Sequence, residues 1–444
     1  MKILLLHLPK GSELRIEDRC ESVGLGYIAA VLRRDGHEVE VLDAHLQCLD
    51  IRETVRAVCA CEFDCLGITT MHQDRPLLMQ VARAVRKHRK DAIITVGGYL
   101  PTLDTQSLLD SCPEVDFVVR GEGENVASDV FGRIARGEDW KSTPGIAYNS
   151  GDKVVMNPLP ALIQDLDSLP FPARDALSQG PPLEWVSIAS SRGCYHKCSF
   201  CSVQSFYLLS GGHAPRYRSP EKVVDEIESI IQASGHSKYS FVDDDFIGPG
   251  EKTRERAVKI VDEIKARNLK INFSLECRAD EVDEDMLRSF MDAGLTGIFL
   301  GIESGVQRQL DTYNKRISVE QNKRAIEMVR RLGLRMQPGF IPFDPYTTIE
   351  ELQENMQFIR DVNLWEGQTG PTPPRIILYP GVPLVEKVRE DGLLKKRGTE
   401  LDYTFKDPSI RIAWGFFQTM AGWSRLKVRV RKLFGLQPRS DKAG

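Results

Sequence analysis

Long hydrophobic runs are missing from this 444-residue chain. No apolar stretch approaches the roughly 18 residues that a membrane-spanning helix needs. The short apolar start, MKILLLHLP, lacks the longer core and the cleavage site of a signal peptide, so it predicts a buried strand. A strong charge of one sign is missing as well, because 59 Lys and Arg face 63 Asp and Glu, a net charge of −4. The composition therefore gives no general attraction to nucleic acid or to an anionic membrane.

Cysteine is scarce: the chain has 10, too few for a disulfide scaffold of this length, and they are clustered. Such usage is typical of a reducing compartment with metal or thiol chemistry, so we expect a cytoplasmic protein. The hydrophobic fraction of 41% and the charged fraction of 27% are those of an ordinary globular protein. The length predicts about two to three domains.

Strands and helices alternate through residues 1–140, with short connections between them. Apolar strands are expected at residues 2–6, 38–42, 65–69 and 92–96, separated by amphipathic helices at 24–34, 54–60 and 75–88. This alternation predicts a Rossmann-like, doubly wound parallel sheet in an α/β protein. Such a sheet binds its ligand outside the carboxyl ends of its strands.

A linker, residues 141–184, separates this domain from a second one. It begins with a β-hairpin around the turn Asn149-Ser150-Gly151-Asp152 and continues as a proline-rich connector. Residues 185–395 alternate again, with strands expected at 186–189, 239–243, 271–276, 297–302, 335–341 and 375–379. Six βα units predict a partial (β/α)6 barrel whose chemistry lies at the carboxyl ends of the strands. Residues 396–444 are expected to be a small helical C-terminal extension.

Three cysteines follow the first strand of the second domain within SSRGCYHKCSFC. Cys194, Cys198 and Cys201 have the spacing C-x3-C-x2-C. Three thiolates on one loop can hold three irons of a four-iron, four-sulfur (4Fe-4S) cluster and leave the fourth iron open. Two alternatives remain: a zinc site with His196 as the fourth ligand, and buried free thiols.

The cysteine spacing, with the aromatic Phe200 one residue before the last cysteine, resembles that of the radical SAM superfamily. The resemblance implies that the open iron binds the amino and carboxylate groups of S-adenosylmethionine (SAM). It also implies that an electron from the reduced cluster cleaves SAM to a 5′-deoxyadenosyl radical. A flavodoxin or a ferredoxin is the kind of electron donor that such chemistry needs.

Further positions resemble the SAM contacts of that family. Asp243 or Asp244, after the second strand, corresponds to the contact with the methionine amino group, and a carboxylate suits an ammonium. The family's contacts to ribose, methionine carboxylate and substrate correspond to Glu276 and Arg278 after the third strand and to Glu303 and Ser304 after the fourth. The alternatives are a helix-capping role for the aspartates and an internal salt bridge of Arg278 with either glutamate.

The first domain resembles the cobalamin-binding subgroup of radical SAM enzymes through VGGYLPT and VDFVVRGEGE. Gly97 and Gly98 follow a strand and leave room for a flat macrocycle close to the backbone. Thr69 and Thr70, at the end of the neighbouring strand, are expected to contact the nucleotide tail or the lower face of cobalamin. The alternative is a Rossmann-like domain that has lost its cofactor.

The histidine motif D-x-H-x-x-G, which coordinates cobalt in some cobalamin enzymes, is not present. His7 lacks the preceding aspartate and is expected to be an ordinary loop histidine, while His72 is a second candidate neighbour of cobalt. The cysteines at 59, 61 and 65 straddle a helix end and a strand start, where buried thiols are more typical than a second metal site.

The resemblance implies a methyltransferase that methylates an unactivated carbon, or phosphorus, of a small molecule or natural product by way of methylcobalamin. A cobalamin-dependent radical SAM cyclase or ring-rearranging enzyme is one alternative, and a non-catalytic cobalamin carrier or sensor is another. No nucleic-acid partner is expected. Residues 411–434 are rich in aromatic and basic side chains. They are expected to cover the open side of the barrel, or to contact a membrane or a lipid-like substrate.

Overall fold

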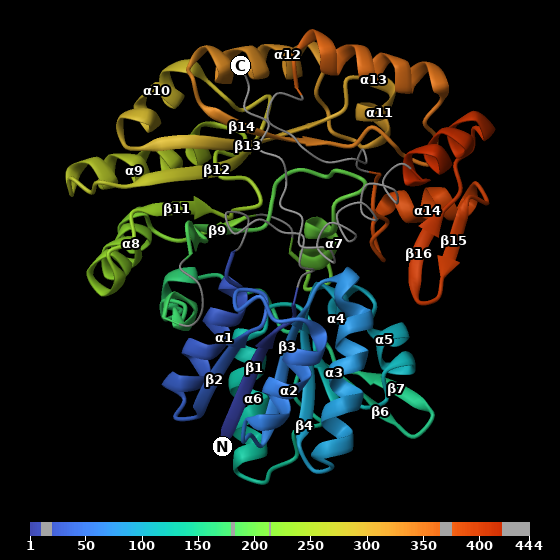
Figure 1. Cartoon of the computed structure of the whole chain (residues 1–444). Coiled ribbons are helices and arrows are strands. Elements are labelled where there is room, and N and C mark those ends of the chain that lie inside the picture. The colour runs from blue at the N-terminus through green and yellow to red at the C-terminus, as the bar shows by residue number, and fades with distance from the viewer. Residues whose placement is uncertain (10–19, 179–182, 213–214, 365–374, 420–444) are drawn as a thin grey trace, which may run out of the picture.

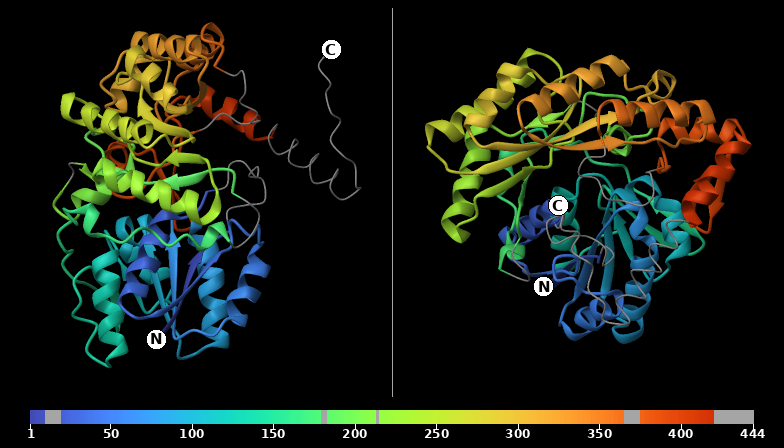
Figure 2. Two further views of the ribbon diagram at one scale, coloured as in Figure 1. Left: turned by 90° about the vertical axis from the view of Figure 1, so that its left-hand side faces the viewer. Right: turned by 45° about the horizontal axis from the view of Figure 1, so that its top comes forward.

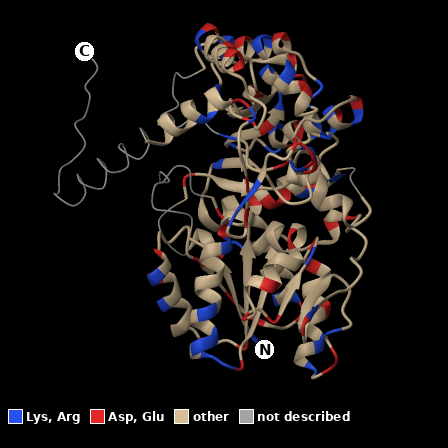
Figure 3. Cartoon of the chain, turned by 90° about the vertical axis from the view of Figure 1, so that its right-hand side faces the viewer, with Lys and Arg blue, Asp and Glu red and all other residues tan. Residues whose placement is uncertain are grey.

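The computed structural model describes residues 1–9, 20–178, 183–212, 215–364 and 375–419. Two α/β domains lie one above the other, with the N-terminal domain below the larger barrel domain in Figure 1. Among the described residues, none of the helices is both long and apolar enough to cross a membrane. Basic and acidic residues are interspersed over both domains (Figure 3).

The N-terminal domain is built on a seven-stranded sheet with the order β2-β1-β3-β4-β5-β6-β7. Its strands are β1 (Lys2–His7), β2 (Glu38–Asp43), β3 (Cys65–Thr70), β4 (Ile93–Gly98), β5 (Phe117–Val119), β6 (Ile146–Ser150) and β7 (Lys153–Met156). The first five strands in sequence pair in parallel, as expected for a Rossmann-like domain. The hairpin β6–β7 pairs antiparallel with β5, so it extends this sheet instead of standing in the linker.

Helices cover both faces of this sheet, and the pleat of β1 shows why. Ile3 and Leu5 pack on one face with α1 (Val23–Arg34) and α6 (Glu124–Ala135). Leu4 and Leu6 pack on the opposite face. The helices on that face are α2 (Ile51–Ala60), α3 (Arg75–His88) and α5 (Thr105–Ser111). A strand with apolar residues on both sides of the pleat is typical of a parallel sheet that is buried on both faces.

The second domain contains a five-stranded parallel sheet with the order β14-β13-β12-β11-β8. Its strands are β8 (Val186–Ile188), β11 (Lys238–Phe241), β12 (Asn272–Arg278), β13 (Leu295–Glu303) and β14 (Arg335–Phe340). Helices α8 (Pro220–Ser234), α9 (Glu251–Ala266), α10 (Glu284–Asp292), α12 (Val319–Arg331) and α13 (Ile349–Asp361) pack on it. In Figure 1, α10, α12 and α13 lie above the sheet, on the side away from the N-terminal domain, and α8 and α9 lie at its left end.

The sixth strand expected at residues 375–379 is reduced to one bridge within the described part of the chain. Arg375 pairs with Phe343, and the amide of Ile376 donates to the carbonyl of Phe343 at 2.9 Å. Ile376 and Leu378 are buried while Ile377 is 56% exposed, so the side chains alternate as in a strand although the backbone pairing stops.

The remaining elements surround the space between the domains and the open edge of the barrel (Figures 1 and 2). They are β9 (Ser191–Arg192), α7 (Ser202–Leu208), β10 (Arg216–Tyr217), α11 (Gln307–Thr312), α14 (Pro383–Glu390), β15 (Leu394–Arg397) and β16 (Glu400–Tyr403). A helix at residues 408–419 follows, and its Trp414 and Phe417 rings pack against Phe343 with centroids 5.2 and 5.8 Å away. The rest of the expected tail, residues 420–434, lies outside the described residues.

Candidate active site

The cysteine loop lies between β9 and α7, at the carboxyl edge of the barrel sheet. Cys194, Cys198 and Cys201 are free thiols, each partly exposed, and the amide of Cys201 donates to the carbonyl of Cys198 at 3.2 Å. Burial raises the pKa of the Cys201 thiol to about 12 and raises the pKa of the other two as well. These thiols are therefore protonated until a metal displaces their protons. Three sulfur donors on one loop fit a cluster that keeps one iron open.

His196, which a zinc site would need as a ligand, points away from this role. Its Nε2 lies 2.9 Å from Glu281 Oε1 and 3.5 Å from Asp245 Oδ2. Burial alone would lower the pKa of His196, but hydrogen bonds to these two carboxylates raise it. The imidazole thus fastens the cysteine loop to the segments that follow β11 and β12.

The aspartates after β11 have different surroundings. Asp243 is 1% exposed and accepts hydrogen bonds from the hydroxyls of Ser190 and Ser191, so its carboxylate is bound by its own domain. Asp244 accepts only the Gly193 amide, at 3.1 Å, and has no cationic partner among the described residues. Asp244 is exposed toward the pocket that it lines, yet the protein around it removes enough water to raise the pKa of its carboxyl to about 6. A carboxylate that is open to a pocket and has no cation beside it suits an incoming ammonium group.

Glu276, near the end of β12, resembles Asp244. Burial, followed by the negative charges of Asp244 and Asp243, raises its pKa to about 7. The described part of the chain offers it no ion-pair partner either. Arg278 instead binds Asp280, at 2.9 Å, and the carbonyl of Lys315, at 2.7 Å. The salt bridge considered between Arg278 and Glu276 or Glu303 is therefore not formed among the described residues.

The residues at the end of β13, Glu303 and Ser304, are held by hydrogen bonds within the barrel domain. Glu303 adopts a positive φ of 61° and accepts a hydrogen bond from Lys315 Nζ at 2.8 Å. Ser304 is fully buried, and its hydroxyl bonds with Gln309 and Asn355. Phe200 packs edge-on against Tyr313, with ring centroids 5.4 Å apart. Phe200 and Ser304 thus contact other residues of the barrel domain.

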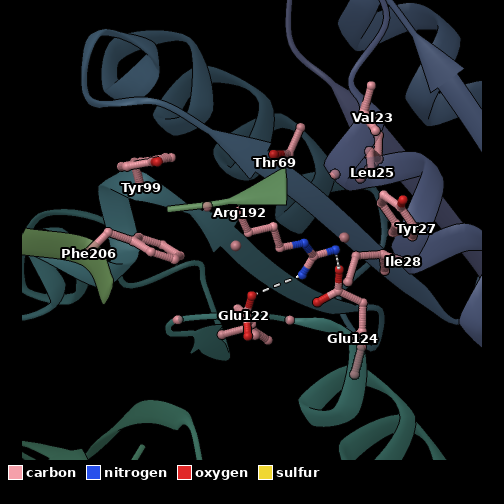
Figure 4. A pocket seen from close by; sticks show the side chains of 18 of the residues that line it. Val23, Leu25, Tyr27, Ile28, Thr69, Tyr99, Glu122, Glu124, Arg192 and Phe206 are labelled. Carbon is pink, nitrogen blue, oxygen red and sulfur yellow. Dashed lines mark hydrogen bonds and ion pairs between the residues drawn. The ribbon is translucent and has the colours of Figure 1, made fainter. Parts of the chain in front are cut away.

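A pocket of about 430 Å³ opens in the N-terminal domain, above the carboxyl ends of its strands (Figure 4). Thr69, Gly97 and Gly98 line it, together with the apolar side chains Leu5, Val23, Leu25, Ile28 and Phe206. A side chain at Gly97 would enter open space, because a Cβ there meets only Val119 at 4.0 Å. Thr95, also in the lining, has a buried hydroxyl without a partner among the described residues. A glycine cradle with a free hydroxyl fits a large cofactor that carries polar groups.

Gly98 and Thr70 hold β4 and β3 close together at the edge of the pocket. Gly98 has a φ of 103°, and a Cβ on it would lie 2.5 Å from the carbonyl oxygen of Thr70. Glycine is thus required here for the close approach of β3, not for the ligand. The hydroxyl of Thr70 donates to the carbonyl of Gly97 at 3.1 Å, and Thr70 is not part of the lining.

Neither candidate histidine lines this pocket. His7 is the last residue of β1, not a loop residue, and its Nδ1 lies 3.0 Å from Asp43 Oδ1. His72 begins the short helix η2 (His72–Asp74), and its buried ring nitrogens have no hydrogen-bond partner among the described residues. Burial and then Arg75 lower the pKa of His72 to about 4. Cys59 and Cys61 are half-buried free thiols and Cys65 is a buried one.

One arginine joins the pocket to the cysteine loop. Arg192 lies on β9, two residues before Cys194, and its guanidinium enters the pocket from the barrel domain (Figure 4). It binds Glu122 Oε1 at 3.1 Å and Glu124 Oε1 at 2.5 Å. No sequence motif pointed to these three residues individually. Their only local signals were the position of Arg192 beside the cysteine motif and the two glutamates of the RGEGE segment.

Comparison with known proteins agrees with the division of the chain into two domains. Residues 14–131 match the B12 binding domain family, and residues 188–359 match the radical SAM superfamily. An uncharacterized methyltransferase of Pyrococcus horikoshii is 27% identical over 420 residues, which are 93% of this chain and 88% of the relative. The anaerobic magnesium-protoporphyrin IX monomethyl ester cyclase of Rubrivivax gelatinosus is 30% identical over 76% of this chain and 62% of its own length.

The solved structure of the cobalamin-dependent S-adenosylmethionine radical enzyme OxsB with aqua-cobalamin bound has a similar fold. Its TM-score is 0.75, with 21% sequence identity over 91% of this chain and 64% of that chain. The two family matches imply that the cofactors of this chain are cobalamin, SAM and a 4Fe-4S cluster. The donor set of the cysteine loop and the glycine cradle fit these groups. The chain belongs to the cobalamin-dependent radical SAM enzymes.

Proposed function

We propose that this enzyme is a methyltransferase that methylates an unactivated carbon, or phosphorus, of a small-molecule substrate. One observation carries the proposal: Asp244 binds the backbone of the cysteine loop and also lines the pocket of the N-terminal domain. A residue common to both sites favours a reaction in which both cofactors act on one substrate. The match over 88% of a protein named as a methyltransferase favours methyl transfer.

In this proposal each group of residues has its own task. Cys194, Cys198 and Cys201 hold the cluster, and the carboxylates of Asp244 and Glu276, which have no cationic partner among the described residues, bind the methionine ammonium of SAM. Thr69 and Gly97 contact the cobalamin, which when bound supplies the methyl group that the substrate receives. Arg192 fixes the spacing between the two cofactors.

A cyclase is the second candidate, since the cyclase relative is 30% identical over 76% of this chain. The two reactions use SAM differently. A methyltransferase converts one SAM to S-adenosylhomocysteine and a second to 5′-deoxyadenosine for each product. A cyclase forms 5′-deoxyadenosine without S-adenosylhomocysteine.

The test is anaerobic reconstitution with iron, sulfide and cobalamin, followed by incubation with SAM and dithionite. We expect about four irons per chain, in line with three-thiolate ligation, and both SAM products. Replacement of the three loop cysteines by alanine should remove the iron and the 5′-deoxyadenosine, whereas Cys48→Ala, an exposed thiol elsewhere, should change neither. Formation of 5′-deoxyadenosine with no S-adenosylhomocysteine would favour the cyclase. An absence of SAM cleavage in the reconstituted wild-type protein would favour a cobalamin carrier.

A further inference from the structure

The cysteine loop has one surface that faces solvent. Tyr195 is 41% exposed and Lys197 is exposed, and neither lines the pocket. The end of the loop is turned inward: the amide of Ser199 donates to the carbonyl of Tyr313 at 2.8 Å, and Phe200 packs on the same tyrosine. Between Cys194 and Cys201, Tyr195 and Lys197 are the residues that are exposed to solvent, so a protein partner would meet the loop there.

Two more basic side chains flank this surface, each connected to the loop by hydrogen bonds. Asn314 Nδ2 donates to the carbonyl of Lys197 at 2.6 Å, and Asn314 Oδ1 accepts from Arg316 Nε at 3.2 Å. Arg254 Nη2 donates at 3.1 Å to the carbonyl of Glu281, the residue that binds His196. Arg316 and Arg254 are thus each connected to the cysteine loop through one further residue, Asn314 or Glu281.

These three cations differ from the other basic residues around the loop. Arg278 is paired with Asp280, and Lys315 is paired with Glu303. Lys197, Arg254 and Arg316 have no carboxylate partner of this kind among the residues that the structure describes. Arg316 is exposed and Arg254 is half-buried. Cations that the protein itself leaves unpaired at a solvent-facing loop are available to an anionic partner.

We propose that Tyr195, Lys197, Arg254 and Arg316 form the docking surface for a small acidic electron-transfer protein of the flavodoxin type. This inference rests on the proposed function, because it requires a cluster on the cysteine loop. In the docked complex the donor loses one electron and the cluster gains it, with no bond made or broken. Complementary charge at the entry point speeds the encounter and orients the donor toward the loop.

The experiment compares a protein donor with a small one. Reduction of the reconstituted cluster is followed by paramagnetic resonance after rapid freezing, with reduced flavodoxin or with dithionite. For Lys197→Glu and Arg316→Glu we expect about a tenfold slower reduction by flavodoxin for each reversal at low ionic strength. The difference should shrink in salt, because the Debye length falls to about 8 Å at 0.15 M. Reduction by dithionite should change little.

Matched controls are Lys87→Glu on α3 and Arg324→Glu on α12, which reverse exposed charges on helices that carry none of the four docking residues. A second readout needs no electron transfer: the affinity of oxidised flavodoxin for the enzyme should fall in the double variant and stay unchanged in the controls. Lys197→Gln and Arg316→Gln remove the charge without reversing it and should give intermediate rates.

Two results would overturn the docking surface. One is wild-type flavodoxin affinity and reduction rate in the double variant. The other is an equal slowing with flavodoxin and dithionite in variants that retain their iron. A failure of the proposed function would give a different result. The wild-type cluster would accept the electron from either donor, yet SAM would not be cleaved.

Discussion

Arg192 Nη1 lies 3.1 Å from Glu122 Oε1, although the arginine belongs to the barrel domain and the glutamate to the cobalamin-binding domain. The same glutamate binds Arg216 of β10, with nitrogen to oxygen distances of 2.8 and 2.9 Å. The guanidinium of Arg192 also stacks over the Tyr27 ring at 5.0 Å. The position of the cysteine loop relative to the pocket of the N-terminal domain is thus set by a buried ionic contact.

We therefore expect Arg192→Gln to destabilise the protein and to weaken cobalamin binding. The change leaves the buried carboxylates of Glu122 and Glu124 with less positive charge, a cost of about 3 kcal/mol in the free energy of unfolding. Urea unfolding and cobalamin titration measure the two effects. Arg33→Gln, which removes a more exposed pair with Asp175, should cost less than about 1 kcal/mol. Equal effects of the two variants would contradict the role of Arg192.

Local pattern was enough to predict most strands and to group three cysteines on one loop. β3 was expected at residues 65–69 and runs over Cys65–Thr70, because a buried parallel strand is apolar on both faces. The three cysteines lie on one loop, so their spacing alone brings them together.

Contacts between distant segments could not be predicted in this way. Arg192 and Glu122 are 70 residues apart, and no local pattern pairs them. The sequence also did not separate Asp243 from Asp244: the hydroxyls of Ser190 and Ser191 enclose the first, whereas the second lines the pocket. The pairing of the expected sixth strand stopped after Arg375, whose guanidinium stacks 3.7 Å over the Tyr403 ring of a later hairpin.

The two glycines of the pocket should respond differently to substitution. Gly97→Val places a side chain in the open pocket, so cobalamin affinity should fall at least tenfold, about 1.4 kcal/mol, while the fold is kept. Gly98→Ala forces a Cβ against the Thr70 carbonyl at a positive φ, so thermal stability should fall. Cobalamin titration and thermal unfolding of both variants are the measurements. A destabilised Gly97→Val protein would show that this position, too, serves the fold.

Glu276 should make the stability of the cofactor-free protein depend on pH. Burial raises its pKa from 4.5 to about 7, so the folded protein holds this proton more tightly than the unfolded chain. The free energy of unfolding should therefore fall as the pH rises from about 4.5 to about 7. Glu276→Gln should flatten this decline, and the exposed Glu62→Gln should not. Urea unfolding at a series of pH values tests it, and an unchanged slope in Glu276→Gln would refute the assignment.

Helix 408–419 should stabilise the open edge of the barrel without taking part in the chemistry. Trp414 and Phe417 pack on Phe343, which is fully buried, while Phe416 on the same helix is 63% exposed. Trp414→Ala should cost about 3 kcal/mol in the free energy of unfolding, and Phe416→Ala should stay within about 0.5 kcal/mol. Urea unfolding of the two variants compares a packed aromatic with an exposed one on a single helix.

A chain ending at Asp407 extends this test from stability to catalysis. Every cysteine and carboxylate assigned to the cofactors precedes that residue, so the shortened enzyme should still bind its iron and cleave SAM slowly without substrate. The ratio of methylated product to 5′-deoxyadenosine should fall, because water and reductant reach a radical site that has lost part of its cover. Iron analysis and quantification of both products measure this. If the shortened protein lost its cluster, the helix would be part of the folding core. If it still coupled SAM cleavage fully to product formation, membrane association of the extension would be the next role to test.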